Sequence, residues 1–462
     1  MLEMVTKVNG FMWGIGLLLL LCGTGIYFTI RLRFIQVRRF GEGIRLVFGH
    51  IKGHSGEKKH GEMTPFQSMA TAIAAQVGTG NLTGAATALI SGGPGAIFWM
   101  WVSAFFGMAT IYAEASLAQE YKTTAHGEVT GGPVYYIRQA FKGTFGKVLA
   151  TLFAVFIILA LGFMGNMVQS NSIGSAFSGV FESRNIPIPP VAVGIVLAII
   201  ALFIFVGGTE RLAQVVEKMV PFMAVIYIIG SLILILLNAA QIPEAFRQIF
   251  VGAFNPSAIV GGAAGITVRE AIRYGVARGL FSNEAGMGST PHAHALANVK
   301  EPHEQGCVAM IGVFIDTFVV LTLNSLVVIC TLYTPDGPLA AGYTGEVVNV
   351  LNNTNLAQSA FGVVFGADLG AKFVAVALFF FAFSTILGWN MFGKVNTEYL
   401  FGKKGVTVYT IISLIFIFLG TTTSSDLVWA LSDMFNQLMV LPNVIGLVGC
   451  TALVVSLTKF KK

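Results

Sequence analysis

The segments AQVGTGNLTG (residues 75–84) and ARGLFSNEAGMG (residues 277–288) interrupt two long apolar runs with glycine, asparagine and hydroxyl residues. Each closely spaced glycine destabilises a helix interior by about 1 kcal/mol relative to alanine, and glycine permits the positive φ angles of an unwound backbone. Both segments contain the pattern Asn-x-x-Gly, starting at Asn81 and at Asn283, about 200 residues apart. The sequence therefore predicts two interrupted helices at corresponding places in the chain.

The composition of the 462 residues indicates a polytopic membrane protein. Hydrophobic residues make up 55% of the chain, glycine supplies 54 positions, and only 11% of residues are charged, against about 25% in soluble domains. These values argue against a disordered chain, a nucleic-acid-binding module and a soluble enzyme. The net charge of +6 does not indicate nucleic-acid binding, because the aromatic residues lie in apolar runs. The four cysteines also lie in apolar runs without metal-type spacing, and we interpret them as small core residues.

Eleven apolar runs are candidates for crossing a hydrocarbon core of about 30 Å. They lie near residues 10–30, 65–92, 95–120, 146–177, 188–207, 212–238, 267–295, 304–334, 367–393, 405–421 and 427–457. Arg31 and Arg33 directly follow the first run, and no signal-peptide cleavage site is evident, so we expect this run to be retained.

Lysine and arginine residues orient these spans. With the N-terminus outside, 21 of them fall on the inner side and three on the outer side, and four lie within spans. This bias follows the positive-inside rule and predicts an outer N-terminus and an inner C-terminus. The longest polar stretch, residues 31–64, is then a basic cytoplasmic loop near anionic lipid.

The two interrupted runs each begin a group of five spans. Because five is odd, the groups enter the membrane from opposite sides and form an inverted repeat, a pattern typical of secondary transporters. The predicted parts are an extra N-terminal helix with its loop (1–64), a first repeat (65–238), an extracellular connection (239–266) and a second repeat with the C-terminus (267–462). Close helix packing would explain one glycine-rich span, but a matched pair favours a binding site.

The helix ends at such interruptions suit a zwitterion. A half-helix that begins near residues 79–81 presents unpaired N–H groups and its positive dipole end to an anion. The preceding half-helix ends in carbonyls around residues 74–77, which suit a cation. An amino acid carries both charges, and a sodium ion can use the remaining oxygens. Ser384 and Thr385 share a helical face with Phe381 and are candidates for that shell, although such hydroxyls also bond back to their own helix.

Four motifs identify a family resemblance: VGTGN (77–81), GGPGAIFWMWVSAFFG (92–107), GNMVQSN (165–171) and GLFSNEAG (279–286). They resemble those of the alanine/glycine:cation symporter family, also called sodium:alanine symporters, and the likeness extends from about residue 10 to 455. The family belongs to the amino acid–polyamine–cation superfamily. The resemblance therefore implies an all-α membrane protein with the leucine-transporter fold behind one extra N-terminal helix. It also implies sodium-coupled uptake of alanine and glycine across a prokaryotic plasma membrane.

The resemblance further implies roles for individual residues around the substrate. The carboxylate would meet Thr79, Gly80 and Asn81, and the ammonium group would meet carbonyls of Phe281 and its neighbours. The other expected substrate contacts are Gln169, Thr385, Met287 and Trp389. Met287 and Trp389 would form the walls of the side-chain pocket and restrict it to small substrates.

The expected sodium site uses only neutral oxygens. Its ligands would be the carbonyls of Ala74, Val77 and Phe381 and the hydroxyls of Ser384 and Thr385. We expect no organic cofactor, no nucleic-acid partner and no catalysis, and a protein that functions as a monomer in the bilayer.

Charges in or beside the spans leave alternatives open, because such groups are functional candidates. They are Glu114, Glu284, Asp316, Arg273 and Arg278. Asp316 is a candidate for a second cation or proton site. Proton coupling is the alternative to sodium, and Asp316 or Glu284 would then carry the proton. Glu284 is expected to contact substrate or to pair with Arg278, and Glu114 to pair or cap inside the bundle. A channel is a further alternative that saturable uptake with countertransport would exclude. A membrane enzyme is disfavoured because the histidines lie mostly in loops and no GxxxxGK[ST] motif is present.

Overall fold

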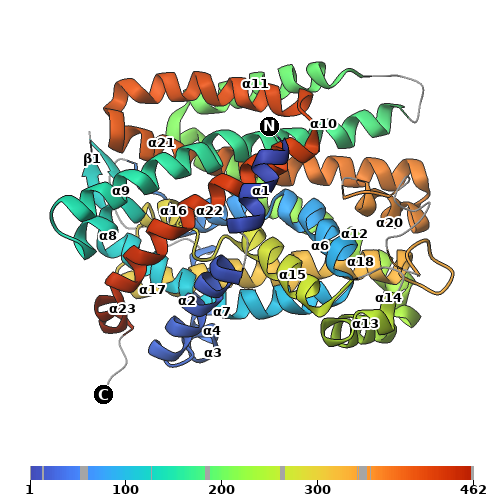
Figure 1. Ribbon diagram of the computed structural model, residues 1–462. Coiled ribbons are helices and arrows are strands. Elements are labelled where there is room, and N and C mark those ends of the chain that lie inside the picture. The colour runs from blue at the N-terminus through green and yellow to red at the C-terminus, as the bar shows by residue number, and fades with distance from the viewer. Residues whose placement is uncertain are drawn as a thin grey trace.

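The computed structural model describes residues 2–12, 15–51, 61–125, 127–182, 188–260, 266–340, 342, 351–353 and 355–458, and these are mostly helical (Figure 1). Residues 52–60 of the predicted basic loop lie outside the described part of the chain. The elements up to the middle of the chain are α1 (Leu2–Met12), α2 (Ile15–Arg31), α3 (Ile35–Arg38), α4 (Phe40–Ile51), α5 (Pro65–Gln76), the π-helix η1 (Gly80–Gly84), α6 (Ala85–Gly92), α7 (Gly95–Glu120), β1 (Thr123–Ala125), β2 (Glu128–Thr130), α8 (Pro133–Ala140), α9 (Thr144–Ile157), the π-helix η2 (Ile158–Gly165), α10 (Asn166–Glu182), α11 (Pro190–Val206) and α12 (Gly208–Leu237).

The second half begins with short elements that connect to the second interrupted helix. Its elements are η3 (Ala239–Gln241), α13 (Ile242–Phe254), α14 (Ser257–Val260), α15 (Val268–Asn283), α16 (Pro291–Ala295), α17 (Pro302–Val313), the π-helix η5 (Phe314–Leu321), α18 (Thr322–Leu332), α20 (Leu356–Phe365), α21 (Ala367–Thr422), α22 (Ser425–Gly449) and α23 (Thr451–Leu457). The two strands form one antiparallel hairpin.

Six helical runs of the described chain are long and apolar enough to cross a membrane. They are Gly95–Glu120, Thr144–Phe181, Gly208–Leu237, Pro302–Leu332, Ala367–Thr422 and Ser425–Gly449. The longest has 56 residues, but Gly402 within it has non-helical backbone angles, so two helices meet there. This junction falls between the runs predicted at 367–393 and 405–421.

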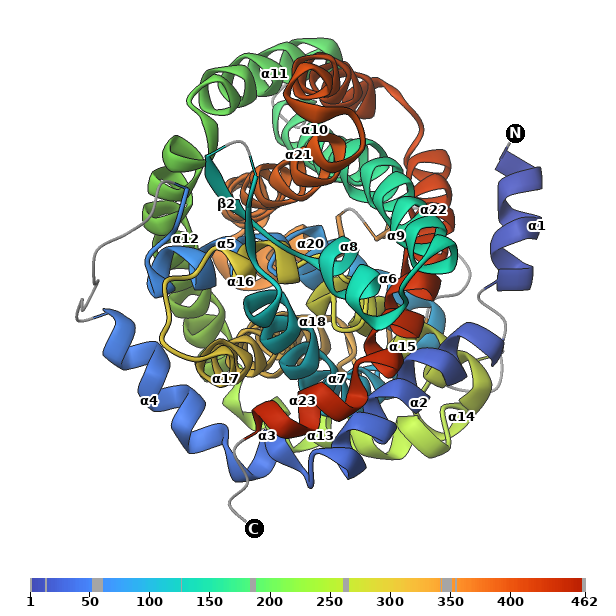
Figure 2. The ribbon, with the colours of Figure 1, turned by 90° about the vertical axis from the view of Figure 1, so that its left-hand side faces the viewer.

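The outer helices present apolar side chains away from the protein. In α11, for example, Ile199, Phe203 and Val206 are 61%, 68% and 74% exposed. Surfaces of this kind are unstable in water but suit lipid. Figure 2 shows α11, α12 and α4 at the periphery, whereas α5 and α16 lie in the interior. The chain thus has the features of an integral membrane protein with its interrupted helices enclosed.

The connections predicted on opposite membrane sides lie at opposite ends of the molecule. In Figure 1, the β hairpin and α8 are at the left-hand end, and α13, α14 and α20 are at the right-hand end. The long helices run between these ends.

The first helix of each predicted repeat starts with the same local structure. Thr64 caps α5 and forms a capping box with Gln67, and Thr267 caps α15 and forms one with Glu270. In both boxes the threonine hydroxyl accepts from the N3 backbone N–H while the N3 side chain accepts from the threonine N–H. The two interrupted helices therefore begin alike.

Candidate functional site

The two interruptions lie against each other in the interior. Residues 77–79 separate α5 from η1, and residues 284–290 separate α15 from α16. A Cβ atom on Gly80 would stand 2.9 Å from the Cα of Ser282, closer than real Cβ atoms come to another atom. The Gln76 side-chain amide also donates to the Asn283 carbonyl, at 2.9 Å. Glycine at position 80 is thus required for the two chain segments to approach this closely.

The second interruption begins later than the sequence predicted. Residues 277–283, expected to be unwound, form the last turns of α15, and the helix ends where Glu284 adopts φ 58°. The helix continues through Gly279 because this glycine serves helix packing. Gly279 lies against Met100 and Ser103 of α7, and a side chain at this position would collide with Ser103. The Phe281 carbonyl still belongs to the last helical turn, whose carbonyls lack partners within the helix.

Asp316 of η5 joins the two interruptions. Its carboxylate accepts a hydrogen bond from the Asn81 side-chain amide at 2.7 Å and from the Ser282 hydroxyl at 3.0 and 3.1 Å. Thr317 donates its hydroxyl to the same group at 2.9 Å. All the hydrogen-bond donors described for this fully buried carboxylate are neutral, so a nearby cation would meet an uncompensated charge.

The first interruption contains Thr79, Gly80 and Asn81, three of the predicted substrate contacts. The Thr79 N–H donates to the Gln169 side-chain oxygen at 3.2 Å, which brings α10 to the same place. The Asn81 side-chain oxygen accepts from the Gly78 N–H at 3.0 Å. The Asn81 side chain therefore stabilises the unwound turn and also binds Asp316. The Thr79 hydroxyl is buried and has no hydrogen-bond partner among the described residues. An orphaned buried hydroxyl of this kind is available to a ligand.

The predicted sodium ligands lie close together, with one exception. The Thr385 hydroxyl is 2.8 Å from the Ala74 carbonyl oxygen and 3.0 Å from that of Phe381. The Ser384 hydroxyl is 2.9 Å from the same Phe381 oxygen. Both hydroxyls therefore bond back within α21, but the contact of Thr385 with α5 joins two helices. Val77 caps α5 through its N–H, and no described contact joins its carbonyl to these hydroxyls.

One of the two predicted pocket walls, Trp389, contacts Phe281. Phe281 and Trp389 pack edge to face with ring centroids 6.1 Å apart. Met287 lies in the second interruption and is 4% exposed. The Trp389 indole N–H donates to Glu284, which also accepts from the Ser289 hydroxyl at 2.5 Å. Glu284 therefore does not pair with Arg278, and the expectation of that pair is wrong.

Glu114 of α7 holds the backbone of the second interruption. Its carboxylate accepts from the N–H groups of Gly286 and Gly288 at 3.0 and 2.9 Å, and from the Asn443 side chain at 2.7 Å. The expectation that Glu114 caps inside the bundle is confirmed. The sequence offered no signal that would name the two amide groups, because they are 172 and 174 residues away.

Arg278 pairs with Asp433 of α22 at one end of the site. Two hydrogen bonds of 3.0 and 2.7 Å join their side chains, and the guanidinium lies 5.3 Å from the Trp429 ring. These residues line a cavity of about 490 Å³. The Trp429 ring also packs against Phe281, with centroids 5.2 Å apart. The ion pair and the aromatic rings therefore separate this cavity from the interruptions.

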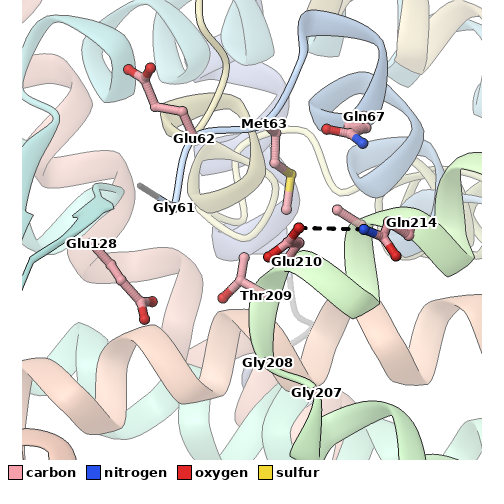
Figure 3. A pocket seen from close by; sticks show the side chains of 11 residues that line it. Gly61, Glu62, Met63, Gln67, Glu128, Gly207, Gly208, Thr209, Glu210 and Gln214 are labelled. Atoms are coloured by element: carbon pink, nitrogen blue, oxygen red, sulfur yellow. Dashed lines mark hydrogen bonds between the residues drawn. The ribbon is translucent and has the colours of Figure 1, made fainter. Parts of the chain in front are cut away.

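A second cavity of about 580 Å³ lies near the start of α5 and is shown in Figure 3. It is lined by residues 61–63 and Gln67, by Glu128 of β2 and by the junction of α11 and α12. Glu210 occupies the centre of this view and accepts from the Gln214 side chain. The linings of the two cavities do not include residues 74–81, so the predicted site is closed toward both.

Comparisons with known proteins find that this chain is similar to alanine transporters. The family model described as "Sodium:alanine symporter family" matches residues 1–461. The "Sodium/alanine symporter AgcS" of Methanococcus maripaludis is 42% identical over 459 residues, which are 99% of this chain and 96% of that protein. The "Putative sodium/proton-dependent alanine carrier protein YrbD" of Bacillus subtilis is 38% identical over 97% of this chain and 90% of its own length.

A solved structure supports the fold. The structure of MhsT in complex with L-phenylalanine aligns with a TM-score of 0.57 and covers 87% of this chain and all of that chain. The sequence identity is 12%, so the likeness concerns the fold alone. That fold is the leucine-transporter fold.

Proposed function

The chain belongs to the sodium:alanine symporter family, and from this premise we propose that it couples sodium entry to the uptake of alanine and glycine. The observation that carries the proposal is the contact between the two interrupted helices, with the orphaned Thr79 hydroxyl at one helix end and a cluster of neutral oxygens nearby. Broken helices of this kind bind substrate and coupling ion near the bilayer midplane in secondary transporters. An amino acid needs both a donor for its carboxylate and acceptors for its ammonium group.

In this proposal the first interruption binds the substrate carboxylate. The backbone N–H groups of Thr79, Gly80 and Asn81 lie at the positive N-terminal end of the following helix, and the orphaned Thr79 hydroxyl adds a donor. The carboxylate would replace the present partners of two of these groups, Gln169 on the Thr79 N–H and the Gly78 carbonyl on the Asn81 N–H. Gln169 orients the segment through its contact with the Thr79 N–H. The last carbonyls of α15, including that of Phe281, accept from the ammonium group. Trp389 and Met287 close the side-chain end, which leaves room only for small substrates.

The sodium ion lies next to the substrate, among the oxygens of Ala74, Phe381, Ser384 and Thr385. Neutral oxygens suit a hard monovalent cation, and the ion would displace the hydrogen bonds that these groups make to one another. Val77 completes the set if its carbonyl turns toward Thr385. Because α5 and α21 both contribute ligands, the ion stabilises the contact between two elements that must separate during transport.

Alternating access follows from closing one end at a time. The Arg278–Asp433 pair and the Trp429 and Phe281 rings form the outer closure, and the cavity near Glu210 opens toward the inner side. We further propose eleven spans, a 5+5 inverted repeat after the N-terminal helix, an outer N-terminus and an inner C-terminus, in the plasma membrane of a prokaryote. The protein would act as a monomer.

Proton coupling is the second candidate, favoured by one observation. Asp316 carries a buried carboxylate that contacts both interruptions and meets only neutral donors among the described residues. Such a group is suited to binding either a second cation or a proton. A relative whose name includes both sodium and protons, YrbD, adds weight to this alternative.

The test is uptake of radiolabelled alanine into proteoliposomes of the purified protein. We expect an inward sodium gradient to drive accumulation, and a proton gradient without sodium to drive none. Accumulation driven by protons alone would replace sodium with protons as the coupling ion. Asp316→Asn then decides whether this carboxylate carries the proton, with the exposed Asp336→Asn as the matched control. Uptake that neither gradient drives and that does not saturate would contradict symport.

A further inference from the structure

A cluster of three side chains lies apart from the transport site, where α4 packs against α17. Glu42 lies in the first turn of α4, and His303 and Cys307 lie one helical turn apart in α17. One donor atom of each lies within 4.8 Å of the other two. Figure 2 shows the two helices side by side at the edge of the molecule. The cluster combines nitrogen, sulfur and oxygen donors, which is the ligand set of zinc.

The distances within the cluster match a tetrahedral site. His303 Nε2 is 3.5 Å from Glu42 Oε1 and 3.6 Å from Cys307 Sγ. Zinc binds nitrogen, oxygen and sulfur at about 2.0–2.3 Å, so two of its ligands in a tetrahedron are about 3.3–3.6 Å apart. An ion can therefore enter this cluster with little movement of its ligands.

Neighbouring groups orient the three donors toward one point. The Tyr112 hydroxyl shares a hydrogen bond of 2.6 Å with His303 Nδ1, which leaves Nε2 facing Glu42 and Cys307. Arg39 donates to Glu42 Oε2 at 2.9 Å, so the other oxygen, Oε1, is the one near His303. Metal-binding histidines and carboxylates are commonly held by such outer contacts.

The packing of α4 against α17 fixes the position of Glu42 relative to His303 and Cys307. A Cβ atom on the adjacent Gly43 would stand 2.8 Å from the Cys307 carbonyl oxygen, so the two backbones approach as closely as glycine allows. Cys307 is fully buried, and the Glu42 side chain is 33% exposed. The carboxylate thus forms the open side of the cluster, through which an ion and one water ligand can enter.

We propose that Glu42, His303 and Cys307 bind one zinc ion, which fastens α4 to α17. Three protein ligands and one water complete the tetrahedron. Both helices belong to segments predicted at the cytoplasmic face, where the thiol of Cys307 stays reduced and available. The site is independent of the transported ion, because sodium does not favour sulfur or imidazole ligands. The alternative is that Glu42, His303 and Cys307 form hydrogen bonds among themselves and bind no metal.

Cobalt substitution tests the proposal. The purified full-length protein is stripped with a chelator and titrated with Co²⁺, which gives a thiolate-to-cobalt charge-transfer band when a cysteine is a ligand. We expect the band to saturate at one ion per chain, to disappear on addition of Zn²⁺ and to be absent in Cys307→Ser. Cys330→Ser is the matched control, because Cys330 is equally buried but lies in α18 outside the cluster, and it should keep the band.

A second measurement covers the case in which Cys307→Ser folds poorly. Zn²⁺ should raise the Tm of the stripped wild type and of Cys330→Ser by about 3 °C or more, because a ligand that binds only the folded state stabilises it. Glu42→Gln changes a partly exposed group and should keep the fold while losing most of this increase. A wild type without a cobalt band, or a band that survives in Cys307→Ser, overturns the proposal.

Discussion

Substitution of Thr385 is the most direct test of the proposed sodium site. Thr385→Ala removes one oxygen beside Ala74 and Phe381, and losing one such interaction costs about 1–1.5 kcal/mol, or about tenfold in affinity. We expect the sodium concentration for half-maximal alanine uptake to rise by about that factor. Thr331→Ala is the control, since Thr331 is buried in α18 and bonds only to its own helix. An unchanged sodium dependence would remove Thr385 from the site.

Trp389 is the residue that should limit substrate size. Trp389→Ala removes the ring that packs on Phe281 and the donor to Glu284, and it leaves space for a branched side chain. We expect competition by valine and leucine against labelled alanine to appear in this variant. Trp101→Ala is the control and should leave selectivity unchanged, because the Trp101 ring packs against Phe246 and Phe250 of α13. Continued rejection of larger substrates would argue against a wall at position 389.

Most of the residues that the sequence predicted for the candidate site lie close to one another in the structure. The oxygens of Ala74, Phe381, Ser384 and Thr385 do lie together, and Gln169 reaches the first interruption. The assignment of functions to these residues stays a prediction. The sequence placed Glu284 with Arg278 as one option because they are close along the chain, whereas each found its partner on a distant helix.

At the scale of elements, the close approach of the two interruptions should depend on Gly80. Gly80→Ala adds a Cβ that must push Ser282 away, and overpacking of this kind costs about 1–3 kcal/mol. We expect alanine uptake to fall at least about tenfold while the protein still purifies as a monodisperse species. Gly23→Ala is the control, because the space around Gly23 in α2 is open. Normal uptake by Gly80→Ala would mean that the segments need not touch.

The elements themselves were predictable to a useful degree. Apolar runs located the long helices, and glycine with asparagine located both interruptions. The exact end of α15 was not predictable, because Gly279 serves helix packing against α7 rather than unwinding. The sequence contains a further matching signal: Thr64 and Thr267 begin capping boxes about 200 residues apart, at nearly the same spacing as the two asparagines. Capping boxes are readable from sequence and would have set both helix starts.

At the scale of the whole molecule, the Arg278–Asp433 pair should stabilise the closure that we propose at the outer end. The two side chains are only 13% and 11% exposed, and removing one partner from a buried pair costs about 3–5 kcal/mol. We expect Arg278→Asp and Asp433→Arg each to lose alanine uptake, and the double exchange to recover part of it. Asp368→Asn, which breaks an exposed pair with Lys372, is the control. No recovery in the double variant would indicate that the pair does not act as a unit.

Hydrophobicity and backbone preference are local properties, and they were enough to determine a membrane protein of many helices with two interruptions. They act within a few residues, so they can be read along the chain. The partners of the buried charges were decided only by the tertiary structure. Burial requires that Arg278, Glu114 and Glu284 each find a counterpart, but which one depends on which helices pack together. The same is true of the Glu42, His303 and Cys307 cluster. His303 and Cys307 lie one turn apart in α17, but Glu42 comes from α4, far away in the chain, and only the packing of the two helices brings it to them.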